Sequence, residues 1–129
     1  MTVRDLARWV PAAAWMTMIF LLSSQERVPA TPVFSAQVMA YVAHFVMFGV
    51  LAGLFCVALA GSQLSIRACV SAVALALCYA IFDEIHQAFV PGRDASVSDV
   101  IVDLAGALSG AFGWYWVHRR SRMVITSCK

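Results

Sequence analysis

Four long apolar runs make up most of the chain, and short polar segments separate them. A helix that crosses a bilayer needs about 20 mostly apolar residues, so the runs predict an all-α bundle of four transmembrane helices. We expect these helices at about 9–25, 34–60, 68–88 and 96–117. Because no polar segment is long enough for a separate soluble module, residues 1–129 are expected to form one domain.

The third and fourth expected helices contain acidic residues. The apolar stretch 68–82 is short, so the third helix reaches spanning length only if Asp83 to Gln87 belong to it. The fourth must include Asp99 and Asp103. A charge inside a spanning helix costs on the order of 2.5–3.5 kcal/mol, and such residues are commonly functional. Since five of the seven acidic residues lie between positions 83 and 103, we place the candidate site there.

Composition supports a membrane protein and excludes other classes. Hydrophobic residues make up 62% of the chain and charged residues 12%, which leaves too little polar surface for a soluble domain. The net charge of +2 comes without a patch of basic and aromatic residues, so no nucleic acid partner is expected. The four cysteines form no Cys-x-x-Cys pair, so neither a zinc site nor a disulfide framework is predicted.

The basic residues predict the orientation of the bundle. Loops on the cytoplasmic side of a membrane carry an excess of lysine and arginine. With the N-terminus inside, only Arg27 and Arg93 of the nine basic residues lie outside. The other seven lie on the cytoplasmic side: Arg4, Arg8, Arg67, Arg119, Arg120, Arg122 and Lys129. We therefore expect both termini to be cytoplasmic (N-in/C-in).

The first expected helix has a second interpretation. Arg4 and Arg8, a short apolar core and the step Val28-Pro29-Ala30 are also features of a cleaved signal peptide. Pro32 and the polar end of the helix argue against cleavage. Cleavage would leave the N-terminus outside and the other three spans unchanged.

In the N-in/C-in orientation the polar groups of all four helices lie at one depth, in the outer leaflet. Packing alone does not explain why four separate segments become polar at the same level. The candidate ligand-binding residues are Ser24, Gln25, His44, Asp83, Glu84, Gln87, Arg93, Ser96, Asp99 and Asp103. Simpler interpretations exist for Asp99, as a residue favoured by the dipole at a helix N-terminus, and for His86, as an interfacial residue.

The charge of this group needs compensation. Asp83, Glu84, Asp94, Asp99 and Asp103 carry −5 against +1 on Arg93, which leaves −4. Such an excess is not stable at low dielectric. Protonated carboxyl groups, protonated His44 and His86, or a bound cation would relieve it. Carboxylates, His44 and the Gln87 amide suit a hard or borderline divalent cation, and a cationic group of a ligand would serve equally. A bare phosphate would be repelled unless Arg93, Arg27 or a metal bridged it.

Local spacings predict how the group is held. Asp83 and Gln87 share a helix face at i, i+4. The segment Val90-Pro91-Gly92-Arg93 indicates a tight turn, which we expect to hold Arg93 near the carboxylates of both adjoining helices. Ser96-x-x-Asp99 has the form of a capping box.

Two glycine pairs, Gly49/Gly53 and Gly106/Gly110, give the second and fourth helices flat faces. Small residues at this spacing let helix backbones approach closely. Oligomerisation through these faces is one expectation.

Several of these segments form a combined pattern: Ser23-Ser24-Gln25, His44-Phe45, Asp83-Glu84-x-x-Gln87-x-Phe89-x-Pro91-Gly92-Arg93, and Ser96-x-x-Asp99 with Gly106 and Gly110. The pattern covers about residues 20–115 and resembles the VanZ-like family. Two positions differ. The family often has lysine where this chain has Tyr41 and asparagine where it has Asp103, so the site here is more acidic than the family pattern.

The resemblance implies a small multi-pass protein of the bacterial cytoplasmic (inner) membrane. The family's namesake is linked to low-level resistance to teicoplanin, a glycopeptide antibiotic that acts on cell-wall precursors outside the membrane. An outward-facing polar pocket that binds an envelope lipid head group or an antibiotic-related ligand fits this role. Membrane lipids are the expected partners.

Other activities stay open. In an enzyme acting on a lipid-linked envelope precursor, Asp83, Glu84 and Asp103 would hold a divalent ion, with His44 as base and Arg93 on a phosphate. A transporter is less suited to four spans, and a purely structural partner would tolerate neutralisation of the acids.

The orientation predicts a labelling pattern in intact cells. A reporter cysteine at Gly92 should react with a membrane-impermeant reagent, because the turn between the third and fourth helices lies outside. A reporter in the 61–65 loop should not react. Labelling of the 61–65 loop but not of Gly92 would reverse the orientation.

Overall fold

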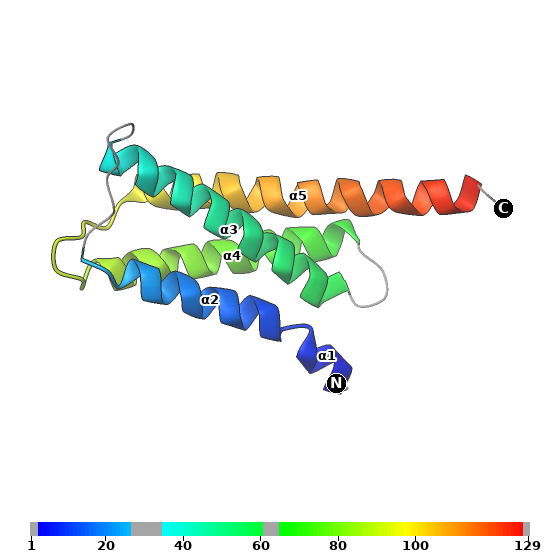
Figure 1. Ribbon diagram of the computed structural model, residues 1–129, viewed down its shortest axis with the longest axis horizontal. Coiled ribbons are helices and arrows are strands. Elements are labelled where there is room, and N and C mark those ends of the chain that lie inside the picture. The colour runs from blue at the N-terminus through cyan, green and yellow to red at the C-terminus, as the bar shows by residue number, and fades with distance from the viewer. Residues whose placement is uncertain (1–2, 27–34, 61–64, 128–129) are drawn as a thin grey trace.

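Every element that the structure describes is a helix. The structure is a computed structural model (Figure 1). It describes the backbone of residues 3–26, 35–60 and 65–127, and side chains as far as residue 120. The helices are α1 (Val3–Ala7), α2 (Val10–Ser23), α3 (Ala36–Ala60), α4 (Ile66–Gln87) and α5 (Val97–Ser127). Arg27, the step Val28-Pro29-Ala30, Phe34 at the expected start of the second helix, and Lys129 lie outside the described residues.

Four of these helical segments are long and apolar enough to cross a membrane, which confirms the all-α bundle of four transmembrane helices. They are Val3–Ser23, Ala36–Ala60, Ile66–Gln87 and Val97–Arg120. The first span consists of α1 and α2. A turn at Arg8 and Trp9 separates them, and Pro11 lies in the first turn of α2, where its missing N–H removes no helical hydrogen bond.

The spans alternate in direction, so both ends of the chain lie at one end of the bundle (Figure 1). The α4–α5 connection lies at the opposite end, which we call the turn end, together with the C-terminus of α2 and the N-termini of α3 and α5. All the candidate residues belong to the turn end. That the turn end faces the outside of the cell stays a prediction from the basic residues.

The last helix is longer than expected. The sequence predicted an end at Val117, whereas α5 continues to Ser127. Residues 118–127 contain neither glycine nor proline, and the arginines among them are good helix formers. The 31 residues of α5 span about 46 Å at 1.5 Å per residue, against a hydrocarbon core of about 30 Å. The candidate membrane span within α5 ends at Arg120, so the helix continues beyond its apolar part.

Helices α3 and α5 form the most extensive contact in the bundle. A Cβ atom at Gly106 would overlap the backbone oxygen of Phe45, and one at Gly110 would overlap that of Gly49. A Cβ at Gly49 would lie 3.1 Å from the oxygen of Gly106. Three of the four glycines are thus used within the chain, while a Cβ at Gly53 would meet nothing within 4 Å. Oligomerisation through these faces stays a prediction.

Hydrogen bonds to backbone carbonyls fasten α2 to its neighbours. The indole of Trp15 donates to the carbonyl of Met47 on α3 at 2.9 Å. From α4, the hydroxyl of Tyr79 donates to the carbonyl of Met16 at 2.7 Å. Helix α2 otherwise makes fewer contacts than α3, α4 and α5 make with one another.

The inward faces of α4 and α5 are built from small residues. On α4 this face consists of Cys69, Ala72, Ala76 and Ala80, all fully buried. On α5 it includes Ala107 and Ala111. Toward the turn end each face continues at the same helical spacing with charged groups, as Asp83 and Glu84 on α4 and as Asp99 and Asp103 on α5.

The α3–α5 contact predicts which glycines tolerate a methyl group. Gly110→Ala should destabilise the protein by about 1–3 kcal/mol, because a rigid backbone cannot move aside for the added atom. Gly113, on the same helix, has nothing within 4 Å of its Cβ position. Gly113→Ala should leave stability unchanged or raise it by up to about 1 kcal/mol, because alanine favours helix. Thermal unfolding of both variants in one detergent checks this, and equal stability would contradict the contact.

Candidate functional site

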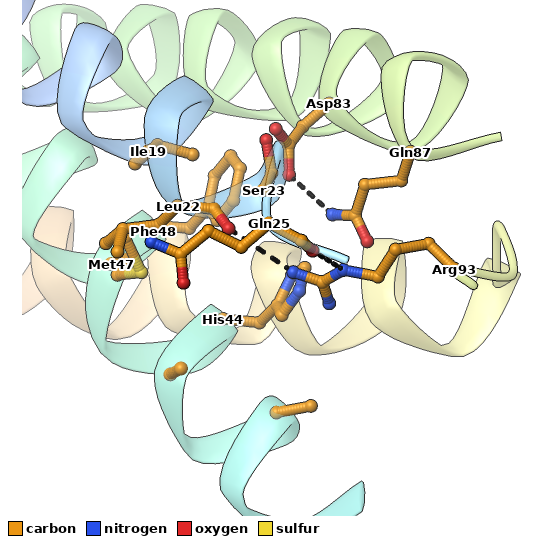
Figure 2. A pocket seen from close by; sticks show the side chains of 12 residues that line it. Ile19, Leu22, Ser23, Gln25, His44, Met47, Phe48, Asp83, Gln87 and Arg93 are labelled. Carbon is orange, nitrogen blue, oxygen red and sulfur yellow. Dashed lines mark hydrogen bonds between the residues drawn. The ribbon is translucent and has the colours of Figure 1, made fainter. Parts of the chain in front are cut away.

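A cavity of about 170 Å³ opens at the turn end between α2, α3 and α4 (Figure 2). One part of its wall is polar and the other is apolar. The polar lining residues are Ser23, Gln25, His44, Asp83, Gln87 and Arg93. The apolar ones are Ile19, Leu22, Ala40, Ala43, Met47 and Phe48.

Helix α4 supplies an acid and an amide to this cavity. Gln87 Nε2 donates to Asp83 Oδ2 at 2.9 Å, as their i, i+4 spacing predicts. Both side chains are 1% exposed, because they continue the alanine face of α4. The second carboxylate oxygen of Asp83, Oδ1, is buried and has no hydrogen-bond partner. A buried carboxylate oxygen without a partner is energetically costly, so it is a natural point for a ligand to bind.

Arg93 lines the same cavity as Asp83, but among the described residues it makes no ion pair with a carboxylate. Its Nε donates to the carbonyl of Gln25 at 3.1 Å and its Nη2 to that of Leu22 at 3.4 Å (Figure 2). Leu22 lies in the last turn of α2, where the helix dipole is negative, and Gln25 follows two residues after the helix ends. Arg93 therefore attaches the α4–α5 turn to the end of α2, and its guanidinium still lines the cavity.

The turn itself explains where Arg93 points. The N–H of Arg93 donates to the carbonyl of Val90 at 3.1 Å, which closes a four-residue turn. Pro91 lies at its second position and Gly92, with φ +78°, at its third. These are the residues that a type II turn requires. A side chain at Gly92 would be strained by that φ value and would also lie against the backbone of Glu26.

The first turn of α5 is capped by another helix. The capping-box spacing predicted reciprocal bonds between Ser96 and Asp99, but Glu84 Oε2 on α4 accepts the Ser96 N–H at 2.7 Å. The Ser96 hydroxyl accepts from the N–H of Ser98 at 3.2 Å. Asp99 is 9% exposed, and its Oδ1 has no hydrogen-bond partner. The sequence could not show this, because the acceptor lies twelve residues away on a packed neighbour.

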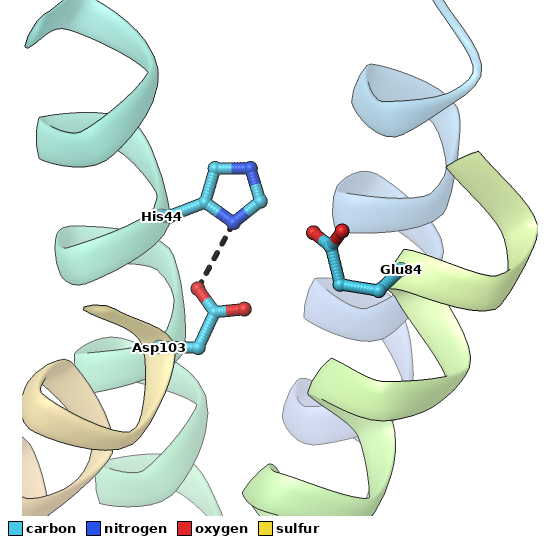
Figure 3. A group of neighbouring side chains, drawn as sticks. All are labelled: His44, Glu84 and Asp103. Carbon is cyan, nitrogen blue, oxygen red and sulfur yellow. Dashed lines mark hydrogen bonds and ion pairs between the residues drawn. The ribbon is translucent and has the colours of Figure 1, made fainter. Parts of the chain in front are cut away.

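A second group of side chains lies where α3, α4 and α5 meet. His44 Nδ1 is 3.0 Å from Asp103 Oδ1, and the carboxylate of Glu84 faces this pair (Figure 3). One ligand atom from each of the three side chains lies within 4.8 Å of the other two. These residues, rather than the expected set with Asp83, are therefore placed to share a metal ion.

Ser24 and His86 lie beside the cavity and join α2 to α4. Ser24 Oγ donates to the carbonyl of Phe20 at 2.6 Å and lies 3.0 Å from His86 Nε2. The imidazole of His86 also stacks on Phe20, with ring centroids 4.4 Å apart. Since the hydroxyl proton of Ser24 is donated to Phe20, the Ser24 oxygen is the acceptor when His86 Nε2 carries a proton.

Ser23, which the sequence did not single out as a candidate, lines the cavity and is 6% exposed. Its signal was its spacing of four residues from Ile19 on the inward face of α2. The hydroxyl of Tyr41 lies 3.3 Å from Ser98 Oγ on α5. Tyr41 thus makes a second link between α3 and the start of α5.

Comparison with known proteins now identifies the family. A family model described as VanZ/LLP1 matches residues 6–118, which include every candidate residue of the turn end. No curated protein and no solved structure matches the chain significantly. With the four spans and the acidic turn end in place, the chain is a multi-pass membrane protein that belongs to the VanZ/LLP1 family.

Proposed function

We propose that this protein binds the head group of a cell-envelope lipid in the cavity between α2, α3 and α4, on the outer side of the inner membrane. The observation that carries the proposal is the buried, unpartnered oxygen of Asp83 in a cavity that also contains the Arg93 guanidinium.

The size of the cavity favours a head group over a whole antibiotic. Its volume of about 170 Å³ is similar to that of a cavity of about 150 Å³ that holds one benzene molecule. A phosphate with a short amine or hydroxyl group is of this size. A glycopeptide, with several amino-acid and sugar units, is many times larger. Any antibiotic-related role is therefore proposed to act through the bound lipid.

The charges of the cavity suit a head group with both a cation and an anion. Asp83 offers an acceptor to an ammonium or hydroxyl group, and Gln87 adds an amide beside it. Arg93 offers donors to a phosphate, for which guanidinium geometry is well matched. A phosphoethanolamine-like group contains both features. A bare phosphate would meet Asp83 without compensation.

The apolar wall provides a path for the lipid chains. Ile19 and Leu22 of α2 and Ala40 and Ala43 of α3 line the cavity. Because α2 is the least tightly packed spanning helix, the α2–α3 side is the natural entry from the bilayer. A head group in the cavity would keep its acyl chains in the surrounding lipid.

Filling the cavity should abolish lipid retention without changing any charge. In phosphatidylcholine nanodiscs doped with phosphatidylethanolamine, native mass spectrometry should detect one retained ethanolamine lipid per wild-type chain. Ala40→Phe should lose it, because Ala40 lines the cavity. Val42→Phe adds the same ring at an exposed position outside the lining and should retain it. Equal retention by the two variants would contradict the proposal.

If the bound lipid contributes to the teicoplanin resistance that the family implies, this resistance depends on the same residues. Deleting the gene should raise susceptibility to teicoplanin, and Asp83→Asn should reproduce this effect. Asp94→Asn makes the same charge change at an exposed position of the turn and should behave as wild type. Unchanged susceptibility on deletion would remove the resistance role, while leaving the lipid-binding measurement as a separate test.

A further inference from the structure

We propose that His44, Glu84 and Asp103 form a binding site for one divalent transition-metal ion, of which Zn²⁺ and Mn²⁺ are the representative probes. The site lies next to the lipid cavity but does not depend on the proposed lipid. It rests on the convergence of three side chains from three helices.

The geometry is that of a nearly assembled ligand set. Metal–nitrogen and metal–oxygen bonds of about 2.0–2.2 Å place any two ligands of one ion at most about 4.4 Å apart. Here the three ligand atoms lie within 4.8 Å of one another. The separation of 3.0 Å between His44 Nδ1 and Asp103 Oδ1 is a hydrogen bond without metal and also suits two adjacent ligands. Only a small movement of the Glu84 carboxylate is needed to close the set.

Carboxylate oxygens without hydrogen-bond partners also indicate a ligand, independently of the distances between the ligand atoms. Asp103 is 1% exposed, and its Oδ2 has no hydrogen-bond partner. Glu84 is 6% exposed and uses Oε2 for the Ser96 N–H, which leaves Oε1 buried without a partner. The Glu84 carboxylate is turned toward His44 and Asp103 (Figure 3). Most buried polar atoms in proteins have hydrogen-bond partners, so two unpartnered oxygens in one cluster of side chains call for a ligand with positive charge.

The negative charge at the turn end also calls for a positively charged ligand. Asp83, Glu84, Asp99 and Asp103 are all buried at the turn end. Among the described residues, the only ion pair that these four make is the one between Asp103 and His44. Arg93, the nearest candidate cation in the sequence, donates to the carbonyls of α2 instead. A divalent ion would offset two of the negative charges at the position where α3, α4 and α5 meet.

The types of ligand indicate the type of metal. Imidazole suits zinc, copper, iron and nickel, whereas carboxylates suit magnesium, calcium and manganese. One imidazole with two carboxylates therefore favours a borderline ion such as Zn²⁺ or Mn²⁺ over Mg²⁺ or Ca²⁺. Three protein ligands also leave a coordination position for water or for a phosphate oxygen. A phosphate in the neighbouring cavity would then be attracted rather than repelled by this acidic region.

The test measures metal binding by the full-length, tag-free protein in nanodiscs of phosphatidylcholine alone. After removal of metal with EDTA, titration with Mn²⁺ or Zn²⁺ should show one ion per chain, with empty nanodiscs as the blank. Glu84→Gln and Asp103→Asn keep the side-chain shape and should each weaken binding by at least about tenfold, which is the lower range for loss of even an outer-shell partner. Asp94→Asn removes an exposed charge of the same turn and should bind as wild type.

A spectroscopic measurement separates this site from general attraction by the acids. The electron paramagnetic resonance of bound Mn²⁺ should show coupling to an imidazole nitrogen, which His44→Gln should remove and His86→Gln should keep. The proposal fails if the wild type binds no more metal than empty nanodiscs, or if Glu84→Gln and Asp94→Asn bind alike. Because no ethanolamine lipid is present, either failure leaves the lipid proposal untouched.

Discussion

The close contact between α3 and α5 determines how the turn end is assembled. At Gly49, Gly106 and Gly110 the two backbones lie so near each other that side chains larger than hydrogen have little or no room. Without water to drive apolar helices together, such contacts are what fix helix positions in a bilayer. The contact sets the register of α3 against α5. Gly106 meets Phe45, so Asp103, one turn earlier on α5, comes to lie beside His44. The polar site is therefore a consequence of backbone packing several ångströms away.

A second constraint is that the polar groups occupy the same helix faces as the core. On α4 the buried face runs from Cys69 through Ala80 to Gln87, and on α5 it runs from Ala111 back to Asp99. The carboxylates are buried because their faces are buried. Such an arrangement is unfavourable for isolated acids in a membrane, and it is retained only where partners offset it. His44, Gln87 and the Ser96 N–H supply three such partners.

The sequence predicted the elements of this fold better than their contacts. Long apolar runs and the spacing of Asp83 and Gln87 follow from helix geometry alone, so the four spans and that hydrogen bond were predictable. The partner of Arg93 was not, because it depends on where the end of α2 lies in space. The same holds for Glu84, whose bond to Ser96 joins two packed helices. Hydropathy locates the end of the apolar run and not the end of the helix, so the sequence did not show that α5 continues to Ser127.

For the candidate site, the residue types were predictable and their grouping was not. All four segments that meet at the turn end were visible as polar interruptions of apolar runs. Only the three-dimensional arrangement shows a cavity lined by Asp83 and Arg93 and an adjacent cluster of Glu84 and Asp103, with His44 belonging to both. Ser23 and Ser24 illustrate the difference. They are neighbours in sequence, yet Ser23 lines the cavity while Ser24 bonds to His86 beside it.

The bond from Ser96 to Glu84 bears on how the chain enters the membrane. As separate helices, α4 and α5 would each bring two carboxyl groups into lipid. Each charge would cost about 2.5–3.5 kcal/mol near the bilayer centre and less toward the edge of the bilayer. When they enter side by side, Glu84 binds the free N–H at the start of α5, and the short type II turn keeps them adjacent. The free energy of insertion is then determined by the helical hairpin as one unit and not by either helix alone. A mutation in α4 can therefore determine whether α5 is inserted.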